Sequence, residues 1–518
     1  MSINTQTWRP AQRRWTIAEI VGSPQFFWFA LGLYLLAHIV LRLWETPNIA
    51  KNDVQEAVAA QGWAWGYHPR NPPLHTWMLM SSYAIFGTRL MAHIVLKYLL
   101  LGATLGFGYL NARRLISKPQ LAVIAGLSMT LLAPFAWTVH TALTHTLLLA
   151  AINLATLWAA LRLTASRRGI DYAIFGLVIG LGFLAKYSYA LFLLPLIAAM
   201  LTQAELRQTL IDRRIAVTFA VALLVFAPHG IWMLEVQFDF IHFLASKQHN
   251  VEPRPYLADV GLGLGGVAFQ ALAFLTPLLL VFAATFRKTF GASASRAPSP
   301  WETAIIRTIV FSLGLLVIDV IVLRAVQFEQ RYMMCALLLA PLAAFAWLAR
   351  REISARALSA FVVATVAIGA LVLIALPARA LLAQRTCHRC WEEMATPELV
   401  HAMRVAGFAE GTIIADHYNL AGNMRLAFPD ARIVAANYEV ATPPVRGEGR
   451  CALVWNARNA GDPLPAAIVA YLDAAGVEPQ GTPSYVVAPL RRSRRMDRFG
   501  FWILDNTDAN CNSRARPN

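Results

Sequence analysis

Repeated apolar runs of about 20 residues constrain this chain more than any other feature. A helix that crosses the hydrocarbon core of a bilayer needs about 20 consecutive apolar residues, and such runs recur from residue 26 to about residue 376. Charged residues make up only 14% of the chain, whereas soluble domains carry roughly 25%. The sequence therefore predicts a polytopic α-helical membrane protein followed by a more polar domain.

We expect eleven transmembrane helices. One long apolar stretch, residues 172–201, is interrupted by Lys186 and its polar neighbours, and we interpret it as two short helices with Lys186 at the turn. A single long tilted helix is the alternative, and it would reverse the topology of everything that follows. The expected spans lie near residues 26–44, 90–112, 119–137, 144–161, 172–185, 188–201, 215–233, 260–285, 303–323, 332–349 and 357–376.

The distribution of arginine and lysine favours the two short helices. With residues 1–25 as a cytoplasmic N-terminus, each of six inner segments carries three basic residues, whereas all the outer segments together carry eight. Because cytoplasmic loops are typically cationic, we expect a bacterial inner-membrane protein whose transmembrane domain covers residues 26–377. Inner basic loops also account for much of the net charge of +16 without a nucleic-acid partner.

Residues 378–518 are predicted to form a periplasmic α/β domain. Its segments read as five strands with a helix between the first two, and a later helix is expected to stop at a glycine. A cluster of arginines separates the last two strands, either as a solvated hairpin loop or as a contact for lipid phosphates or acidic sugars. These arginines are Arg491, Arg492, Arg494, Arg495 and Arg498.

Four of the five cysteines, Cys387, Cys390, Cys451 and Cys511, fall in this tail. An even number in an oxidising compartment predicts two disulfides, with three possible connectivities. The Cys-x-x-Cys at 387–390 is alternatively redox-active or half of a zinc site.

The segment between the first two spans, residues 45–89, contains the most reactive combination of side chains. Asp53 and Glu56 are three residues apart, so on a helix they share a face. Aromatic residues, His68 and Arg70 follow, and then a rigid Asn71-Pro72-Pro73. We interpret a carboxylate here as a general base for a sugar hydroxyl; the alternative is a solvated loop helix.

Further polar residues are expected at the outer side, near one membrane depth. Lys186, with Tyr187 and Tyr189, either pairs with a lipid phosphate or reaches to the interface. Arg331 either contacts a phosphate in a bidentate manner or pairs with Glu329. No metal-ligand spacing and no nucleotide-binding loop occurs, so a soluble nucleotide-sugar donor is disfavoured.

Three histidines complete this expected outer group. His140 and His145 flank the junction of the third and fourth spans, and His229 follows Pro228 inside an apolar span. Interfacial capping and a hydrogen bond in the core are the alternatives to substrate binding.

The 45–89 segment resembles the first loop of polyprenyl-phosphate-dependent glycosyltransferases of the GT-C fold, the family 39 or protein mannosyltransferase-like group. The resemblance rests on Asn52-Asp53, Trp65-Gly66-Tyr67, Pro72-Pro73-Leu74 and Trp77. It is closest to rhizobial-type galacturonosyltransferases of the lipopolysaccharide core and lipid A. That closer similarity rests on Leu143-Thr144-His145-Thr146, on the residues around Lys186, on Pro228-His229, on Arg331 and on ADHYNLAGNMRLAFPDARIV in the tail.

Two positions depart from the family pattern. Asn52 replaces one member of the acidic pair, which leaves open whether Asp53 or Glu56 is the base and whether a metal is held. Asn71 stands where the family has a basic residue, with Arg70 one position earlier.

The resemblance implies an inverting transfer from a polyprenyl-phosphate sugar to an envelope glycolipid or glycan. Asp53 would act as base with Glu56 beside it, and we expect Asp53 to face a wet cavity. No cofactor would be required, although a divalent metal stays open, and the sugar could be galacturonic acid, mannose or aminoarabinose. Donor phosphate contacts are implied for Lys186, Arg331, Arg70, Tyr187 and Tyr189, and substrate contacts for His68, His140, His145 and His229.

Shared outer depth also predicts that Lys186 and Arg331 approach one another. A transporter or flippase of a lipid-linked sugar is the main alternative, and a non-catalytic envelope sensor is the second. Neither internal repeats nor paired broken helices are visible in the sequence, which disfavours a transporter.

Overall fold

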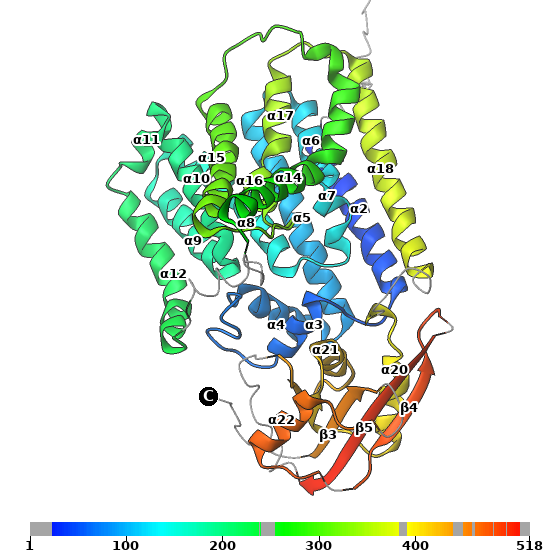
Figure 1. Cartoon of the computed structure of the whole chain (residues 1–518). Coiled ribbons are helices and arrows are strands. Elements are labelled where there is room, and N and C mark those ends of the chain that lie inside the picture. The colour runs from blue at the N-terminus through cyan, green and yellow to red at the C-terminus, as the bar shows by residue number, and fades with distance from the viewer. Residues whose placement is uncertain are drawn as a thin grey trace, which may run out of the picture.

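The structure is a computed structural model that describes residues 23–237, 239, 254–382, 391–438, 449–457, 462–479, 481–493 and 495–507. Figure 1 shows a bundle of long helices with a smaller α/β domain attached at one end, which we call the domain end. The long helices of the bundle are α2 (Pro24–Glu45), α5 (Leu90–Leu115), α6 (Pro119–Ser128), α8 (Thr144–Ser166), α9 (Gly169–Ala185), α10 (Ala190–Leu201), α12 (Ile215–Glu235), α14 (Tyr256–Phe286), α15 (Pro300–Leu323), α17 (Ala340–Ala349) and α18 (Ala355–Leu381). Shorter α-helices and 3-10 helices between them are η1 (Met129–Leu131), α7 (Ala133–Ala136), η2 (Thr138–His140), η3 (Tyr187–Tyr189), α11 (Ala204–Leu210), η4 (Arg287–Thr289) and α16 (Met333–Leu337).

The bundle is that of a polytopic membrane protein. Among the described residues, seven helices are long and apolar enough to cross a membrane, or up to eight if the bent pair Tyr187–Leu201 and Ala204–Leu210 forms one span. Shorter apolar helices at Pro119–Leu131, Gly169–Ala185 and Met333–Ala349 coincide with further expected spans. The count of eleven spans stays a prediction.

Two expected spans, near 119–137 and 332–349, are interrupted. In the first, α6 ends and α7 begins afresh; in the second, α16 ends and α17 begins afresh. Pro134 and Pro341 occupy the first turns of the new helices. Because proline lacks an N–H but fits the first turn of a helix, these residues restart the helix where the apolar pattern alone indicates continuity.

The apolar stretch 172–201 is two helices, as predicted. The helix α9 ends directly before Lys186, and α10 begins after the turn η3. The chain before α9 and the chain after α10 lie side by side, since Arg167 Nη2 donates to the carbonyl oxygen of Glu205 in α11 at 3.3 Å. The pair is therefore a hairpin with Lys186 at its turn, and a single long helix is excluded.

The α/β domain is a five-stranded sheet in the order β2-β1-β3-β5-β4. Strands β2, β1 and β3 are parallel, with β2 at one edge of the sheet, and β5 and β4 continue it as antiparallel strands to the other edge. In register, Ile413 lies opposite Ile433 and Ala452, and all three belong to a buried core. The elements are η5 (Trp391–Glu393), α20 (Thr396–Val405), β1 (Gly411–Ala415), α21 (Tyr418–Ala427), β2 (Arg432–Ala435), β3 (Arg450–Asn456), α22 (Ala466–Ala475), β4 (Ser484–Pro489) and β5 (Met496–Thr507).

The strands and helices predicted for the tail are confirmed. The helix α21 connects the parallel strands β1 and β2, and α22 ends at Gly476, which has a φ of +66°. That conformation is common at glycine after a helix. Cys451 is disulfide-bonded and Cys335 is a buried free thiol; the predicted pairing partners Cys387, Cys390 and Cys511 lie outside the described residues.

The α/β domain packs directly on the segment that follows α2. There, α3 (Asn52–Ala59) lies against α21, as Figure 1 shows. A Cβ at Gly422 would lie 2.5 Å from Val54 Cβ, so glycine permits this close approach. Next to it, Asn423 Oδ1 accepts from Ile49 N at 3.0 Å, and Asn423 Nδ2 donates to the Ile49 carbonyl at 3.0 Å.

Two further contacts fasten the domain to the bundle. Gln61 Nε2 donates to the Ile433 carbonyl, and Ile433 N donates to Gln61 Oε1, both at 2.8 Å. The side-chain amide thus pairs with the free edge of β2 and covers it. Arg492 of the predicted arginine cluster lies 4.3 Å from the ring centroid of Trp44 and donates to its carbonyl.

Candidate active site

The helix α3 presents two buried carboxylates between the bundle and the α/β domain. Asp53 and Glu56 are 8% and 6% exposed, so the alternative of a solvated loop helix is excluded. The preceding residue, Lys51, has a φ of 58°, a region that side-chain-bearing residues rarely adopt and that concentrates at functional sites.

Asp53 forms an ion pair with a lysine of the bundle. Lys97 Nζ, from the second turn of α5, donates to Asp53 Oδ2 at 2.8 Å. The cavity next to the pair is only about 10 Å³, and it is also lined by His75, His93 and Thr144. Such a volume holds about one water molecule, so the expectation of a wet cavity around Asp53 is wrong.

Glu56 is bound by three side chains. Its Oε1 lies 2.7 Å from His145 Nε2, and its Oε2 lies 3.0 Å from His75 Nδ1. The Thr76 hydroxyl donates to Oε2 at 2.8 Å. His75 and Thr76 lie in the first turn of α4 (Leu74–Phe86), which begins directly after the rigid Pro72-Pro73. Proline therefore sets the point at which these two residues begin a helix and face Glu56.

Both carboxyl groups are ionised at neutral pH. Burial opposes their ionisation, but Lys97 and His93 hold the pKa of Asp53 below its ordinary value. In the same way, His145 and His75 outweigh burial and hold the pKa of Glu56 well below its ordinary value. Each carboxylate is consequently a hydrogen-bond acceptor only.

The first turn of α8 connects Glu56 to the hairpin lysine. One residue after His145, the Thr146 hydroxyl accepts from Lys186 Nζ at 2.9 Å. The residue before α8, Leu143, has a φ of 72°, which is strained for a bulky side chain. The structure therefore brings together Asp53, Glu56, His145 and Lys186 from segments that are far apart in the sequence.

The residues after Lys186 make specific polar contacts. Tyr187 OH lies 2.9 Å from His229 Nε2, and His229 Nδ1 lies 2.7 Å from the Trp65 carbonyl. Tyr189 is fully buried, with its OH 2.8 Å from the Thr156 hydroxyl. Tyr187 and His229 therefore join the hairpin to the 45–89 segment, whereas Tyr189 packs inside the bundle.

The other predicted residues lie around this centre. His140 is buried, stacks on His38 at 3.8 Å between ring centroids, and lies 3.2 Å from Tyr98 OH. His68 stacks on Tyr438 of the α/β domain at 5.3 Å. The backbone N–H of Arg70 donates to His68 Nδ1 at 3.0 Å.

Arg331 pairs with Glu329 at 2.6 Å, which is the alternative that the sequence offered for it. This pair does not exclude a phosphate contact, because Arg331 has further donors. The approach of Arg331 to Lys186 stays a prediction.

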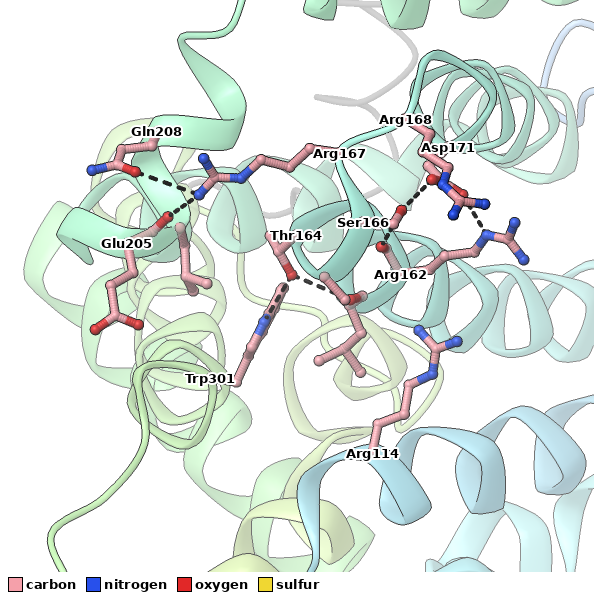
Figure 2. Close-up of a pocket in the computed structure, with 13 residues that line it drawn as sticks. Arg114, Arg162, Thr164, Ser166, Arg167, Arg168, Asp171, Glu205, Gln208 and Trp301 are labelled. Carbon is pink, nitrogen blue, oxygen red and sulfur yellow. Dashed lines mark hydrogen bonds and ion pairs between the residues drawn. The ribbon is translucent and has the colours of Figure 1, made fainter.

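A wide cavity lies at the opposite end of α8, and Figure 2 shows the residues around it. Its volume is about 720 Å³ and four arginines line it, together with Asp171 and Glu205. Arg162 Nε lies 2.5 Å from Asp171 Oδ1, so one arginine is already paired. The helix spans about 30 Å between Thr146 and Ser166 at 1.5 Å per residue, which separates this cavity from the carboxylates of α3. The arginines are Arg114, Arg162, Arg167 and Arg168.

Comparisons with known proteins indicate the class of protein to which this chain is similar. Residues 70–232 match the family model of the dolichyl-phosphate-mannose-protein mannosyltransferases. Two Rhizobium johnstonii proteins, the lipopolysaccharide core galacturonosyltransferases RgtA and RgtB, are each 27% identical to this chain. The matches cover 92% of this chain and 97% of RgtA, and 91% and 96% for RgtB. The chain is a glycosyltransferase.

The fold of this glycosyltransferase is also similar to that of a solved structure. The structure of ArnT from Cupriavidus metallidurans bound to undecaprenyl phosphate aligns with a TM-score of 0.58 and 13% identity, over 92% of this chain and 98% of ArnT. The apo structure of ArnT gives a TM-score of 0.55. The resemblance to GT-C glycosyltransferases is therefore confirmed, and the transporter and sensor alternatives are set aside.

Three residues of the candidate site were not identified from the sequence. Lys97 stands in the apolar run of α5, and a lysine at membrane depth is a functional signal by default. His75 and His93 carry weaker signals, since a lone histidine beside an apolar run is commonly a core residue. Lys97, His75 and His93 contact Asp53, Glu56 and Tyr83, respectively, which belong to other helices, so spacing within one segment could not indicate them.

Proposed function

We propose that this glycosyltransferase moves a sugar from a polyprenyl-phosphate donor to a lipopolysaccharide-type acceptor. The full-length similarity to RgtA and RgtB supports a lipopolysaccharide acceptor and galacturonic acid as the sugar. The fold shared with an undecaprenyl-phosphate-bound enzyme supports a polyprenyl-phosphate donor. One observation carries the proposal: a buried carboxylate helix at the domain end is joined through His145 and Thr146 to the cation Lys186.

Asp53 is proposed as the general base. It takes the proton of an acceptor hydroxyl, whose oxygen forms a bond to the anomeric carbon as the bond from that carbon to the phosphate oxygen breaks. Lys97 keeps Asp53 ionised and oriented, so an unprotonated oxygen is available to accept a proton in a buried site. The acceptor must displace the Lys97 contact or approach the other carboxylate oxygen, because the adjoining cavity is small. An in-line attack of this kind inverts the anomeric configuration.

The leaving polyprenyl phosphate gains negative charge, so cations are proposed to receive it. Lys186 is the first of these, since it stands at the hairpin turn beside the carboxylate helix. Arg70 and Arg331 are proposed to assist, with Tyr187 as a further donor. Preorganised cations of this kind stabilise charge that develops in the transition state. His68 and His229 are proposed to contact the sugar or the acceptor, while His140, His145 and Tyr189 support the site from within the bundle.

We further propose that the domain end faces the periplasm. Residues 1–25 would then be cytoplasmic, residues 26–377 would form the membrane domain and residues 378–518 would be periplasmic. The arginines around the wide cavity of Figure 2 lie at the opposite end, where the cytoplasmic loops would be cationic.

The proposed function is tested by mass spectrometry of lipid A and core oligosaccharide from a deletion strain. We expect one hexuronic acid to be missing and to return on complementation with the wild-type gene but not with an Asp53→Asn gene. An unchanged envelope glycan profile would contradict the proposal. Loss of a neutral hexose or an aminosugar would show that the enzyme transfers that sugar and not galacturonic acid.

A further inference from the structure

Glu56 and Asp53 differ in their counter-charges. Asp53 faces the permanently charged Lys97, whereas within the described part of the chain the ion pairs of Glu56 are with His75 and His145 alone. A histidine is positively charged only when it is protonated, and a buried carboxylate without a fixed cation is costly. The surroundings of Glu56 are therefore suited to an additional positive charge.

The side chains of Glu56, His75 and His145 point toward one another, as the ligands of a single metal ion would. The nitrogens His75 Nδ1 and His145 Nε2 and a carboxylate oxygen of Glu56 all lie within 4.8 Å of one another. Two atoms that each bind one ion at about 2.0–2.2 Å lie roughly 3–3.5 Å apart. The distances of 3.0 and 2.7 Å from the carboxylate to the two nitrogens are close to that separation.

The set is also rigid and buried. One ligand comes from each of α3, α4 and α8, and the exposed fractions of Glu56, His75 and His145 are 6%, 4% and 4%. Because the ligands belong to three helices, the sequence contains no short metal-binding spacing. The Thr76 hydroxyl donates to Glu56 Oε2, and hydrogen bonds of this kind orient carboxylate ligands in metal sites.

We propose that Glu56, His75 and His145 bind one divalent transition-metal ion, with Zn²⁺ as the principal candidate. Two imidazoles and one carboxylate are a ligand set of zinc sites that keep a coordination position open. Resting on the proposed function, the ion would bind an oxygen of the donor phosphate or of the acceptor hydroxyl, one helical turn from Asp53. The ion would also supply the fixed positive charge that Glu56 lacks.

Metal content tests the proposal directly. Protein purified in detergent is stripped with a chelator, loaded with Zn²⁺, desalted and analysed by mass spectrometry of the metal. We expect about one Zn²⁺ per wild-type chain and at least a tenfold lower content in Glu56→Gln and in His145→Gln. His401→Gln, on an exposed face of α20, is the matched control and should keep the wild-type content.

A second measurement covers the case in which a variant folds poorly. Zn²⁺ should raise the thermal midpoint of stripped wild-type protein and of His401→Gln, because a ligand that binds the folded state stabilises it. Equal Zn²⁺ content in all variants, or a wild-type protein with no stoichiometric metal and no thermal shift, overturns the metal site. Sugar transfer by such metal-free protein would leave the proposed function standing, so the two failures are distinguishable.

Discussion

Lys97 Nζ lies 2.8 Å from Asp53 Oδ2, and this contact joins a membrane helix to the helix that carries the proposed base. Both side chains are buried. Because neither charge is solvated by water, each is stabilised by the other, and removal of one leaves the second buried without compensation. The Lys97–Asp53 ion pair is therefore expected to affect both the free energy of unfolding and the proposed role of Asp53 as the base.

We predict that Lys97→Met destabilises the protein, because it leaves the Asp53 carboxylate buried without its cation. Breaking one side of a buried ion pair costs about 3–5 kcal/mol, which thermal unfolding in detergent would register as a lower midpoint. Lys97→Met combined with Asp53→Asn removes both charges and should recover most of that loss. Equal midpoints for the single and double variants would show that the unpaired Asp53 carboxylate is not the cause of the loss.

The same double variant separates stability from catalysis. Asp53→Asn keeps the shape of the side chain but removes the basic oxygen, and loss of a general base typically lowers the rate about 10²–10⁴-fold. We expect the double variant to unfold near the wild-type midpoint yet to transfer sugar no faster than Asp53→Asn alone. Glu56→Gln should retain more activity than Asp53→Asn. The reverse order would contradict Asp53 as the base, and wild-type rates in both would refute a mechanism built on α3.

Contact between the α/β domain and α3 should be needed for activity. A methyl group at Gly422 would lie 2.5 Å from Val54 Cβ, and overpacking of this kind costs about 1–3 kcal/mol. Gly422→Ala is therefore predicted to lower both the thermal midpoint and the transfer rate. Gly369→Ala is the control, since nothing lies within 4 Å of its Cβ position in α18. Should both variants behave alike, close packing on α3 has no role.

Local features of the site were predictable from the sequence. The spacing of Asp53 and Glu56 placed both on one face of a helix, and the break at Lys186 followed from polar residues inside an apolar stretch together with the charge distribution. Both depend on neighbours within a few residues, which is the range over which sequence patterns are informative.

Features that depend on distant segments were not predictable. The packing of α21 against Val54 of α3 depends on Gly422, more than 360 residues later in the chain. Lys97 and His75 acquire their roles only when α5 and α4 pack beside α3. The interruptions before α7 and α17 show a different limit, since hydropathy does not register where a proline restarts a helix.

The α/β domain should become less stable as pH rises through mildly acidic values, because of Asp416. Burial raises the pKa of this carboxyl from 3.8 to about 6; its Oδ2 accepts from Asn456 N, and its Oδ1 has no hydrogen-bond partner. The folded state therefore binds the proton more tightly than the unfolded state, so stability is greatest below pH 4 as far as this group is concerned. The contribution of Asp416 to the free energy of unfolding is lost between about pH 4 and 6, by about 3 kcal/mol in total, since each pKa unit corresponds to about 1.36 kcal/mol.

Asp416→Asn, which is neutral throughout and keeps an oxygen for Asn456, should raise the thermal midpoint at pH 7 but leave it nearly unchanged at pH 4. Thermal unfolding of both proteins across this range measures the difference, and a midpoint gain of Asp416→Asn that is the same at pH 4 and pH 7 would show that Asp416 is not the titrating group.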